Sequence, residues 1–259
     1  MSLIIGSLII HPLAFCAVIF LLMLAGVMEF FHLVGNKDVY PQRIIGLLTS
    51  SILFFITSLI ALEILPANYL AFLPLLIILF FVAEFFRDKP KVLQNLAYSI
   101  FPLMYITIPL SMLVFLVSPS ASGAQRHWHL AFSFFIILWS NDTFAYLTGM
   151  IFGKHKFFEK ISPKKTWEGT IGGILFGLLA AYILSHFFLE LSLGQWLAGA
   201  LIITITGTLG DLSESLLKRN FKVKDSGTFF PGHGGVLDRF DSILFAAPAF
   251  FCYLILLHL

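Results

Sequence analysis

The residues best suited to chemistry gather in one segment, residues 211–241, which reads DLSESLLKRNFKVKDSGTFFPGHGGVLDRFD. It holds five of the fourteen Asp and Glu residues and five of the sixteen Lys and Arg residues. Its glycines allow backbone N–H groups to converge on an anion, and the neighbouring basic side chains add positive charge. Carboxylates at both ends of such a segment predict a Mg²⁺ ion whose other ligands are oxygens of a polyphosphate. The segment is not a Walker loop, because the pattern GxxxxGK[ST] is absent.

The beginning of this segment continues an apolar run and predicts the end of a long helix. At 3.6 residues per turn, Asp211, Glu214, Ser215 and Lys218 share one helix face. The ordinary alternative is a solvated helix end with incidental ion pairs. Asp211, however, follows an uncharged run over residues 195–210, and an acid at membrane depth is costly. This position favours a functional role.

The composition places these residues in a membrane protein. Of 259 residues, 59% are hydrophobic and 12% are charged, and the mean hydropathy is +0.95. Soluble domains are about 45–50% apolar and about 25% charged. The composition therefore excludes a water-soluble globule, a disordered chain and a nucleic-acid-binding domain. Cys16 and Cys252 lie in apolar runs, which gives no support to a disulfide framework or a zinc site.

Eight apolar segments are long enough to cross a bilayer, which needs about 20 residues of helix. They are residues 13–34, 44–65, 69–86, 93–117, 128–152, 170–189, 195–209 and 242–258. Residues 3–10 are too short to cross alone; they form an interfacial or re-entrant piece, or join the next segment through a kink at Pro12. We expect an all-α polytopic protein with eight, or at most nine, membrane helices. Residues 1–125 would form its N-terminal helices and residues 126–259 the helices carrying the catalytic loops, all in a single membrane domain.

The basic residues predict the orientation. Fifteen of the sixteen Lys and Arg residues fall in one set of alternating loops, and only Arg126 falls in the other. The positive-inside rule assigns the basic set to the cytoplasm. Two loops of that set are long, residues 153–169 and 210–241, and the function is expected there. The compact chain favours a bacterial inner membrane over an organelle.

The charged segment resembles a known family signature. The pattern Ser215-x-x-Lys218-Arg219, then Lys224-Asp225-x-Gly227, then His233-Gly234-Gly235-x-x-Asp238-Arg239-x-Asp241 is similar to that of the phosphatidate cytidylyltransferases, or CDP-diacylglycerol synthases. Two upstream stretches, NDTFAYLTG at residues 141–149 and SPKKTWEG at residues 162–169, also resemble that family. The resemblance covers roughly the second half of the chain.

The resemblance implies a reaction in which CTP and phosphatidate give CDP-diacylglycerol and pyrophosphate on the cytoplasmic side of the membrane. It further implies a helical membrane protein that forms a homodimer, with a site centred on Mg²⁺ that also admits K⁺. Both substrates are anions, so a metal ion and fixed basic side chains would neutralise their repulsion.

By position, the resemblance makes Asp211 and Asp238 the metal-binding pair, with Ser215 close by, and the types and places of the other residues complete the expected site. The metal ligands would be Asp211 and Asp238, with Asp142 and Asp241 as further candidates. The catalytic group would comprise Asp211, Lys218, Arg219, Asp238 and Arg239. The substrate-binding group would comprise Ser215, Lys224, Asp225, Gly227, His233, Gly234, Gly235, Lys164, Lys165 and Thr166.

Several of these residues have an alternative interpretation. Asp142 could bond a neighbouring helix, although carboxylates inside membranes are usually functional. Lys164 and Lys165 could be a positive-inside anchor instead of a phosphate or headgroup clamp. Glu29 and Glu84 are explained as well by snorkelling or helix pairing as by a site. His233 is either a proton or hydrogen-bond donor to the triphosphate or a turn residue.

Two other functions compete with cytidylyl transfer. A CTP-dependent lipid kinase, such as a polyprenol kinase, would transfer the γ-phosphoryl group and release CDP. A secondary transporter would need midplane acids in both halves and an inverted repeat, whereas the acids here crowd one loop. Enzymes of the CDP-alcohol type are disfavoured, because the pattern DG-x-x-AR is absent.

Overall fold

The computed structural model of the chain describes residues 2–35, 39–117, 128–227 and 234–257. Among these residues, eight helical segments are long and apolar enough to cross a membrane, as the sequence predicts. They are Pro12–Val34, Arg43–Ala61, Ala67–Phe85, Val92–Phe115, Trp128–Phe152, Trp167–Leu184, Leu193–Asn220 and Leu237–Leu256. The expected all-α polytopic fold is confirmed.

The chain forms two compact units. Unit 1 contains Met1–Arg126 together with Val223–Arg239, and unit 2 contains His127–Lys222 together with Phe240–Leu259. The charged segment of residues 211–241 is therefore divided: its first part belongs to unit 2, its middle part to unit 1, and its end again to unit 2.

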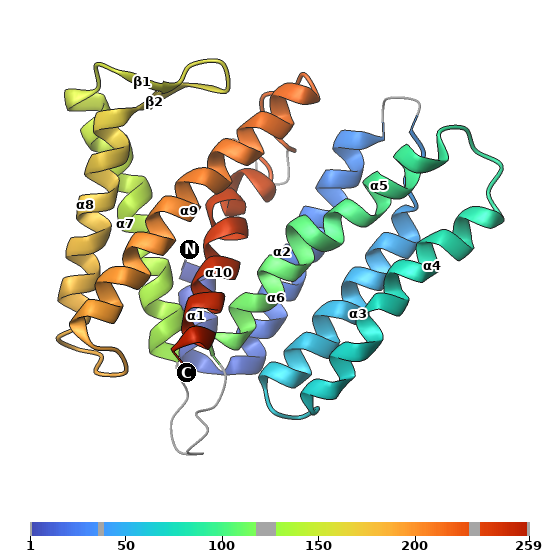
Figure 1. Ribbon diagram of the computed structural model, residues 1–259, viewed down its shortest axis with the longest axis horizontal. Helices are drawn as coiled ribbons and strands as arrows, with labels where there is room; N and C mark the ends of the chain where they lie inside the picture. Colours follow the sequence, from blue (N-terminus) through green and yellow to red (C-terminus); the bar gives the residue numbers. More distant parts are fainter. Residues whose placement is uncertain (1, 36–38, 118–127, 228–233, 258–259) are drawn as a thin grey trace. The chain divides into compact units, whose positions relative to one another are not determined.

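Unit 1 is a bundle of helices drawn in blue to green in Figure 1. Helix α1 (Ser2–Ile10) is separated from α2 (Pro12–Val34) by His11, whose backbone is extended and whose side chain caps α2 by accepting from the N–H of Leu13. Residues 3–10 thus form a helix of their own. The remaining elements are α3 (Arg43–Ala61), the 3₁₀ helix η1 (Ala67–Phe72), α4 (Leu73–Phe85), α5 (Val92–Pro102), the π-helical turn η2 (Leu103–Thr107) and α6 (Ile108–Phe115).

A buried polar network fastens α3, α4 and α5 to one another. The Glu84 carboxylate accepts from Gln42 Nε2 at 2.5 Å and from Arg87 Nη1 at 2.9 Å. Asn95 Nδ2 also donates to Glu84, at 3.3 Å, and Asn95 Oδ1 accepts from the N–H of Tyr40. Buried polar groups need such partners. Of the two interpretations that the sequence leaves open for Glu84, the structure therefore shows the helix pairing.

Unit 2 contains α7 (Trp128–Phe152), α8 (Trp167–Leu184), α9 (Leu193–Asn220) and, from Phe240 onward, α10 (Leu237–Leu256), whose first three residues belong to unit 1. Gly169, Gly173 and Gly177 form one face of α8 that lies directly against α7 and α9 (Figure 1). A Cβ atom on Gly173 would lie 2.7 Å from the backbone oxygen of Asn141, so only glycine permits this approach. Small residues at such spacing allow close helix packing where lipid provides no hydrophobic drive.

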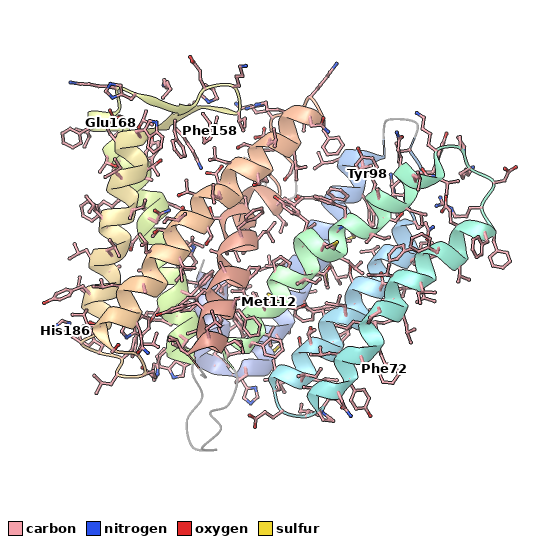
Figure 2. The ribbon with its side chains drawn as sticks, viewed as in Figure 1. Phe72, Tyr98, Met112, Phe158, Glu168 and His186 are labelled. Carbon is pink, nitrogen blue, oxygen red and sulfur yellow. The ribbon has the colours of Figure 1, made fainter. Side chains whose placement is uncertain are left out.

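A short β-hairpin joins α7 to α8, in a stretch that the sequence predicts only as a loop. Strands β1 (Lys156–Phe158) and β2 (Ser162–Thr166) pair antiparallel, with Lys156 opposite Thr166. Glu168 fixes the entry to the hairpin: its carboxylate accepts from the N–H groups of Lys154 and His155 and lies 2.6 Å from His155 Nδ1. Figure 2 shows Glu168 and Phe158 at this end of α8 and His186 at the other end.

Every Lys and Arg of unit 2 lies at the hairpin end of the unit. They sit on or beside the hairpin, or in the last turns of α9 and just beyond: Lys154, Lys156, Lys160, Lys164, Lys165, Lys218, Arg219 and Lys222. The ion pair between Lys165 of β2 and Asp211 of α9 places the basic residues of the hairpin and those at the end of α9 at the same end of the unit. Within unit 2, the charge asymmetry read from the sequence is therefore a property of the fold.

Candidate active site

Asp211 lies in α9 beside a lysine of the hairpin. Lys165 Nζ is 2.7 Å from Asp211 Oδ2 and 3.5 Å from the backbone oxygen of Thr208. Helix α9 continues without a break from the apolar run to Asn220, which confirms the predicted helical continuation. The structure thus joins two of the predicted site residues, one from each long basic loop.

Three further carboxylates belong to the same part of unit 2. Asp241 of α10 interacts electrostatically with Asp211 and Glu214 of α9 and with Asp142 of α7. Asp142 in turn interacts with Asp211 and Lys165. We call these four side chains the acidic cluster: Asp142, Asp211, Glu214 and Asp241. It draws on three helices that are far apart in the sequence.

Glycine allows α10 to approach α9 at this cluster. A Cβ atom on Gly210 would lie 2.5 Å from the backbone oxygen of Asp241 and 3.2 Å from the Cα of Ser242. With no side chain at residue 210, the first part of α10 packs directly on the turn that carries Asp211. Gly210, the last residue of the uncharged run before Asp211, therefore leaves room for the backbone of Asp241.

The predicted common face of α9 is also confirmed. Ser215 Oγ donates to Asp211 Oδ1 at 3.4 Å. Lys218 forms an ion pair with Glu214 one turn earlier, and both side chains are largely buried. The order Glu then Lys at this spacing suits the helix dipole. Glu214 is absent from the residues assigned by resemblance, although its place on the Asp211 face is visible in the sequence.

The cluster contains oxygen donors suited to Mg²⁺. Among the residues that the structure describes, no group of three or more His, Cys, Asp or Glu side chains is arranged to hold a metal ion on its own. Mg²⁺ commonly takes one or two carboxylates and completes its shell with water and substrate phosphates. The donors therefore fit a Mg²⁺ ion that binds together with a polyphosphate.

Asp238 organises the glycine-bearing part of the segment in unit 1. Its Oδ2 accepts from the N–H of Ser226 at 2.9 Å, from Ser226 Oγ at 3.0 Å and from the N–H of Gly235 at 2.8 Å. Gly234 has a positive φ of 81°, and a Cβ atom there would lie 2.8 Å from the same oxygen. The carboxylate thus joins the two described ends of the segment. His233 lies outside the described residues.

Glu29, which the sequence leaves open, contacts this segment from α2. Its carboxylate accepts from the N–H of Val236 at 2.8 Å and from the N–H of Leu237 at 2.9 Å. Ser226 Oγ lies 3.3 Å from Glu29 Oε2. The only signal in the sequence was an acid inside an apolar span, which Glu29 shares with Glu84.

The remaining assigned residues differ in exposure. Lys164, Arg219, Lys224, Asp225 and Arg239 are exposed. Thr166 is buried; its Oγ1 accepts from the N–H of Gly169 and caps α8, so its hydroxyl stabilises the start of this helix. Asp211 belongs to unit 2 and Asp238 to unit 1, so their joint action on one metal stays a prediction.

Eight apolar helices, with an acidic cluster and lysines at the basic end of unit 2, define a polytopic helical membrane protein. The chain belongs to the Cytidylyltransferase family, whose profile matches residues 1–257.

Individual relatives carry a more specific name. The chain is 49% identical over 116 residues to the phosphatidate cytidylyltransferase of Staphylococcus haemolyticus, a stretch that covers 44% of each chain. It is 40% identical over 166 residues to the phosphatidate cytidylyltransferase of Rickettsia prowazekii, covering 61% of this chain and 70% of that relative. The aligned part thus spans less than half of the staphylococcal relative and about two thirds of the rickettsial one.

Proposed function

We propose that this protein transfers the cytidylyl group of CTP to phosphatidate, giving CDP-diacylglycerol and pyrophosphate. The observation that carries the proposal is the acidic cluster of unit 2 with Lys165 bound to Asp211, in a chain of the Cytidylyltransferase family. The names of the relatives supply the substrates.

The reaction requires two anions to meet. A phosphate oxygen of phosphatidate attacks the α-phosphorus of CTP, a new P–O bond forms, and the bond from that phosphorus to the β-phosphate oxygen breaks. The electron pair leaves with pyrophosphate. The attacking phosphate monoester is already ionised at neutral pH, so no protein nucleophile is needed. What the protein must supply is positive charge and alignment.

The chain's own residues divide this task. Asp211, assisted by Asp142 and Asp241, would hold Mg²⁺, and Asp238 would complete the site from the other end of the segment. Bound there, Mg²⁺ would neutralise the triphosphate and stabilise the leaving group. Lys165, Lys218, Arg219 and Arg239 would bind phosphate oxygens, as would Lys164 and Lys224. Because these groups lie on or beside the ends of helices long enough to cross the bilayer, the acyl chains could stay in lipid while CTP arrives from water.

The sidedness and assembly form part of the same proposal. The basic end of unit 2 would face the cytoplasm, since Lys and Arg concentrate on that side of membrane proteins. A bacterial inner membrane fits the bacterial relatives. The resemblance also predicts a homodimer and a contribution from K⁺. The particle mass in detergent and the activity in K⁺-free buffer test these two points.

Two differently labelled nucleotides test the function. Purified full-length protein in detergent is incubated with phosphatidate, Mg²⁺ and CTP labelled at either the α- or the γ-phosphorus. We expect the α-label in a lipid that co-migrates with CDP-diacylglycerol and the γ-label in pyrophosphate. Transfer of the γ-label to lipid would instead identify a lipid kinase. No labelled lipid from either nucleotide would reject both enzymes and return the transporter to consideration.

A further inference from the structure

Glu29 is a carboxylate that the reaction does not use, yet it is among the most heavily hydrogen-bonded acids of unit 1. The residue is 9% exposed and lies in α2, remote in sequence from the charged segment. One carboxylate oxygen accepts from the N–H of Val236 and the other from the N–H of Leu237. These two N–H groups begin α10, where the first turn of a helix leaves its backbone donors unsatisfied.

The arrangement supplies the hydrogen bonds that a buried carboxylate needs. Burial of a carboxylate is costly unless hydrogen bonds and charge compensate for it. The N-terminus of a helix supplies both, since its N–H groups point outward and its dipole is positive there. Glu29 therefore holds the start of α10 through both of its carboxylate oxygens.

Two glycines of the family signature leave room for Glu29. A Cβ atom on Gly227 would lie 2.5 Å from Glu29 Oε1, and its three nearest atoms all belong to Glu29. A Cβ atom on Gly235 would lie 2.2 Å from Ser226 Oγ and 2.6 Å from both Glu29 carboxylate oxygens. In the structure, these glycines make room for a buried side chain of α2, which accounts for them without a bound anion.

Packing on the same face of α2 supports the contact. Gly26 lies one turn before Glu29, and a Cβ atom on Gly26 would lie 3.3 Å from Leu237 Cδ2. Ser226 Oγ is 3.3 Å from Glu29 and 3.0 Å from Asp238, and its single proton serves one carboxylate at a time. Glu29 and Asp238 thus both lie within hydrogen-bond distance of the Ser226 hydroxyl, and both contact the segment there.

We propose that Glu29 is a positioning residue for cytidylyl transfer: it holds residues 226 and 235–237 so that Asp238, Arg239 and Lys224 meet the nucleotide in a set arrangement. The inference rests on the proposed function. Glu29 does not touch the reacting atoms in this role; it acts through the backbone of Val236 and Leu237. It also gives the first half of the chain a part in the site.

The test compares Glu29→Gln with Glu84→Gln in the purified full-length protein. Both changes remove the charge of a buried carboxylate in unit 1, but only Glu29 contacts the segment. Loss of hydrogen bonds to a charged group predicts that Glu29→Gln lowers kcat about tenfold or more and accelerates hydrogen exchange at Val236 and Leu237 by a similar factor. Exchange in α3 should not change. Glu84→Gln should leave the exchange of Val236 and Leu237 unaltered and keep kcat within about twofold per folded molecule.

A double-mutant cycle separates contact from general damage. Gly227→Ala should lower the melting temperature in the native background but have little effect in Glu29→Ala, because the atoms that its methyl group meets are then gone. Equal effects in both backgrounds would contradict the packing argument.

Two outcomes overturn the proposal. Native exchange at Val236 and Leu237 in Glu29→Gln would show that the carboxylate does not hold the segment. Accelerated exchange with native kcat and KM would show a structural contact without a positioning role. If the native protein transfers no cytidylyl group, the proposed function fails and the positioning role falls with it, while the exchange data still decide whether Glu29 holds the segment.

Discussion

Lys165 Nζ lies 2.7 Å from Asp211 Oδ2, an ion pair that links strand β2 to helix α9 within unit 2. Neither side chain is fully buried, since the exposed fractions are 23% and 35%. The ammonium group therefore stands beside the carboxylate proposed as the principal metal ligand. A partly exposed lysine in that position can offset the charge of the acidic cluster and can also turn toward a phosphate.

Lys165→Met should separate these two effects. Without the ammonium group, the acidic cluster should bind Mg²⁺ more tightly, so activity should saturate at a lower Mg²⁺ concentration. At the same time kcat should fall about tenfold or more, because one phosphate partner is lost. Steady-state rates over a Mg²⁺ titration measure both quantities.

Lys165→Arg is the matched control, since it keeps the charge. It should retain more activity than Lys165→Met and a Mg²⁺ dependence close to the native one. Unchanged kcat in Lys165→Met would show that the ion pair is incidental.

Asp211→Asn should reduce cytidylyl transfer by about a hundredfold or more, because an amide is a poor ligand for Mg²⁺ and carries no charge. The control is Ser213→Ala on the opposite side of the same helix, where Ser213 Oγ only donates to the backbone oxygen of Leu209. Rates and CTP-binding isotherms of both purified variants provide the comparison. Native rates in Asp211→Asn would remove this residue from the metal site.

Lys218→Met should lower stability as well as activity. Glu214 is almost fully buried, and removal of the lysine paired with it leaves its charge without this partner. Breaking a buried ion pair on one side costs about 3 kcal/mol, which should appear as a lower melting temperature in detergent.

The double change Glu214→Gln with Lys218→Met distinguishes folding from catalysis. It removes both charges, so most of the lost stability should return. Activity should stay low if Lys218 also serves a phosphate. Recovery of both properties together would assign Lys218 to the fold alone.

Gly173→Ala should destabilise unit 2, because its methyl group would lie 2.7 Å from the backbone oxygen of Asn141. Overpacking of this kind costs about 1–3 kcal/mol. Gly194→Ala is the control, since no atom outside its own helix lies within 4 Å of its added Cβ. Thermal unfolding of the two variants should differ clearly; equal melting temperatures would show that α7 and α8 can separate at little cost.

The span count and the extent of α9 follow from the sequence for simple reasons. Apolar length is a local property, and the polar residues from Asp211 to Lys218 keep the helical spacing of the run before them. The hairpin could not be predicted from the sequence, because β1 has only three residues and the alternation of polar and apolar side chains that indicates a strand needs a longer segment. Thr166 carried a local signal, a capping residue before a helical stretch, that could have indicated its role in α8.

The role of Glu29 could not be predicted by any local reading. Glu29 and Glu84 both precede Phe-Phe in apolar spans, and the sequence treats them alike. One accepts hydrogen bonds from the backbone at the start of α10, whereas the other accepts from side chains of neighbouring helices. Only the tertiary fold decides which long-range partner reaches a buried acid.

The contact between Glu29 and the start of α10 also has a consequence for biosynthesis. The ribosome makes Glu29 early, whereas Ser226, Val236 and Leu237 emerge about two hundred residues later. During that interval the nascent bilayer protein carries an acid whose hydrogen-bond donors do not yet exist. The buried hydrogen bonds of Glu29 can therefore form only after the start of α10 has been synthesised, so this part of the fold is completed late in translation.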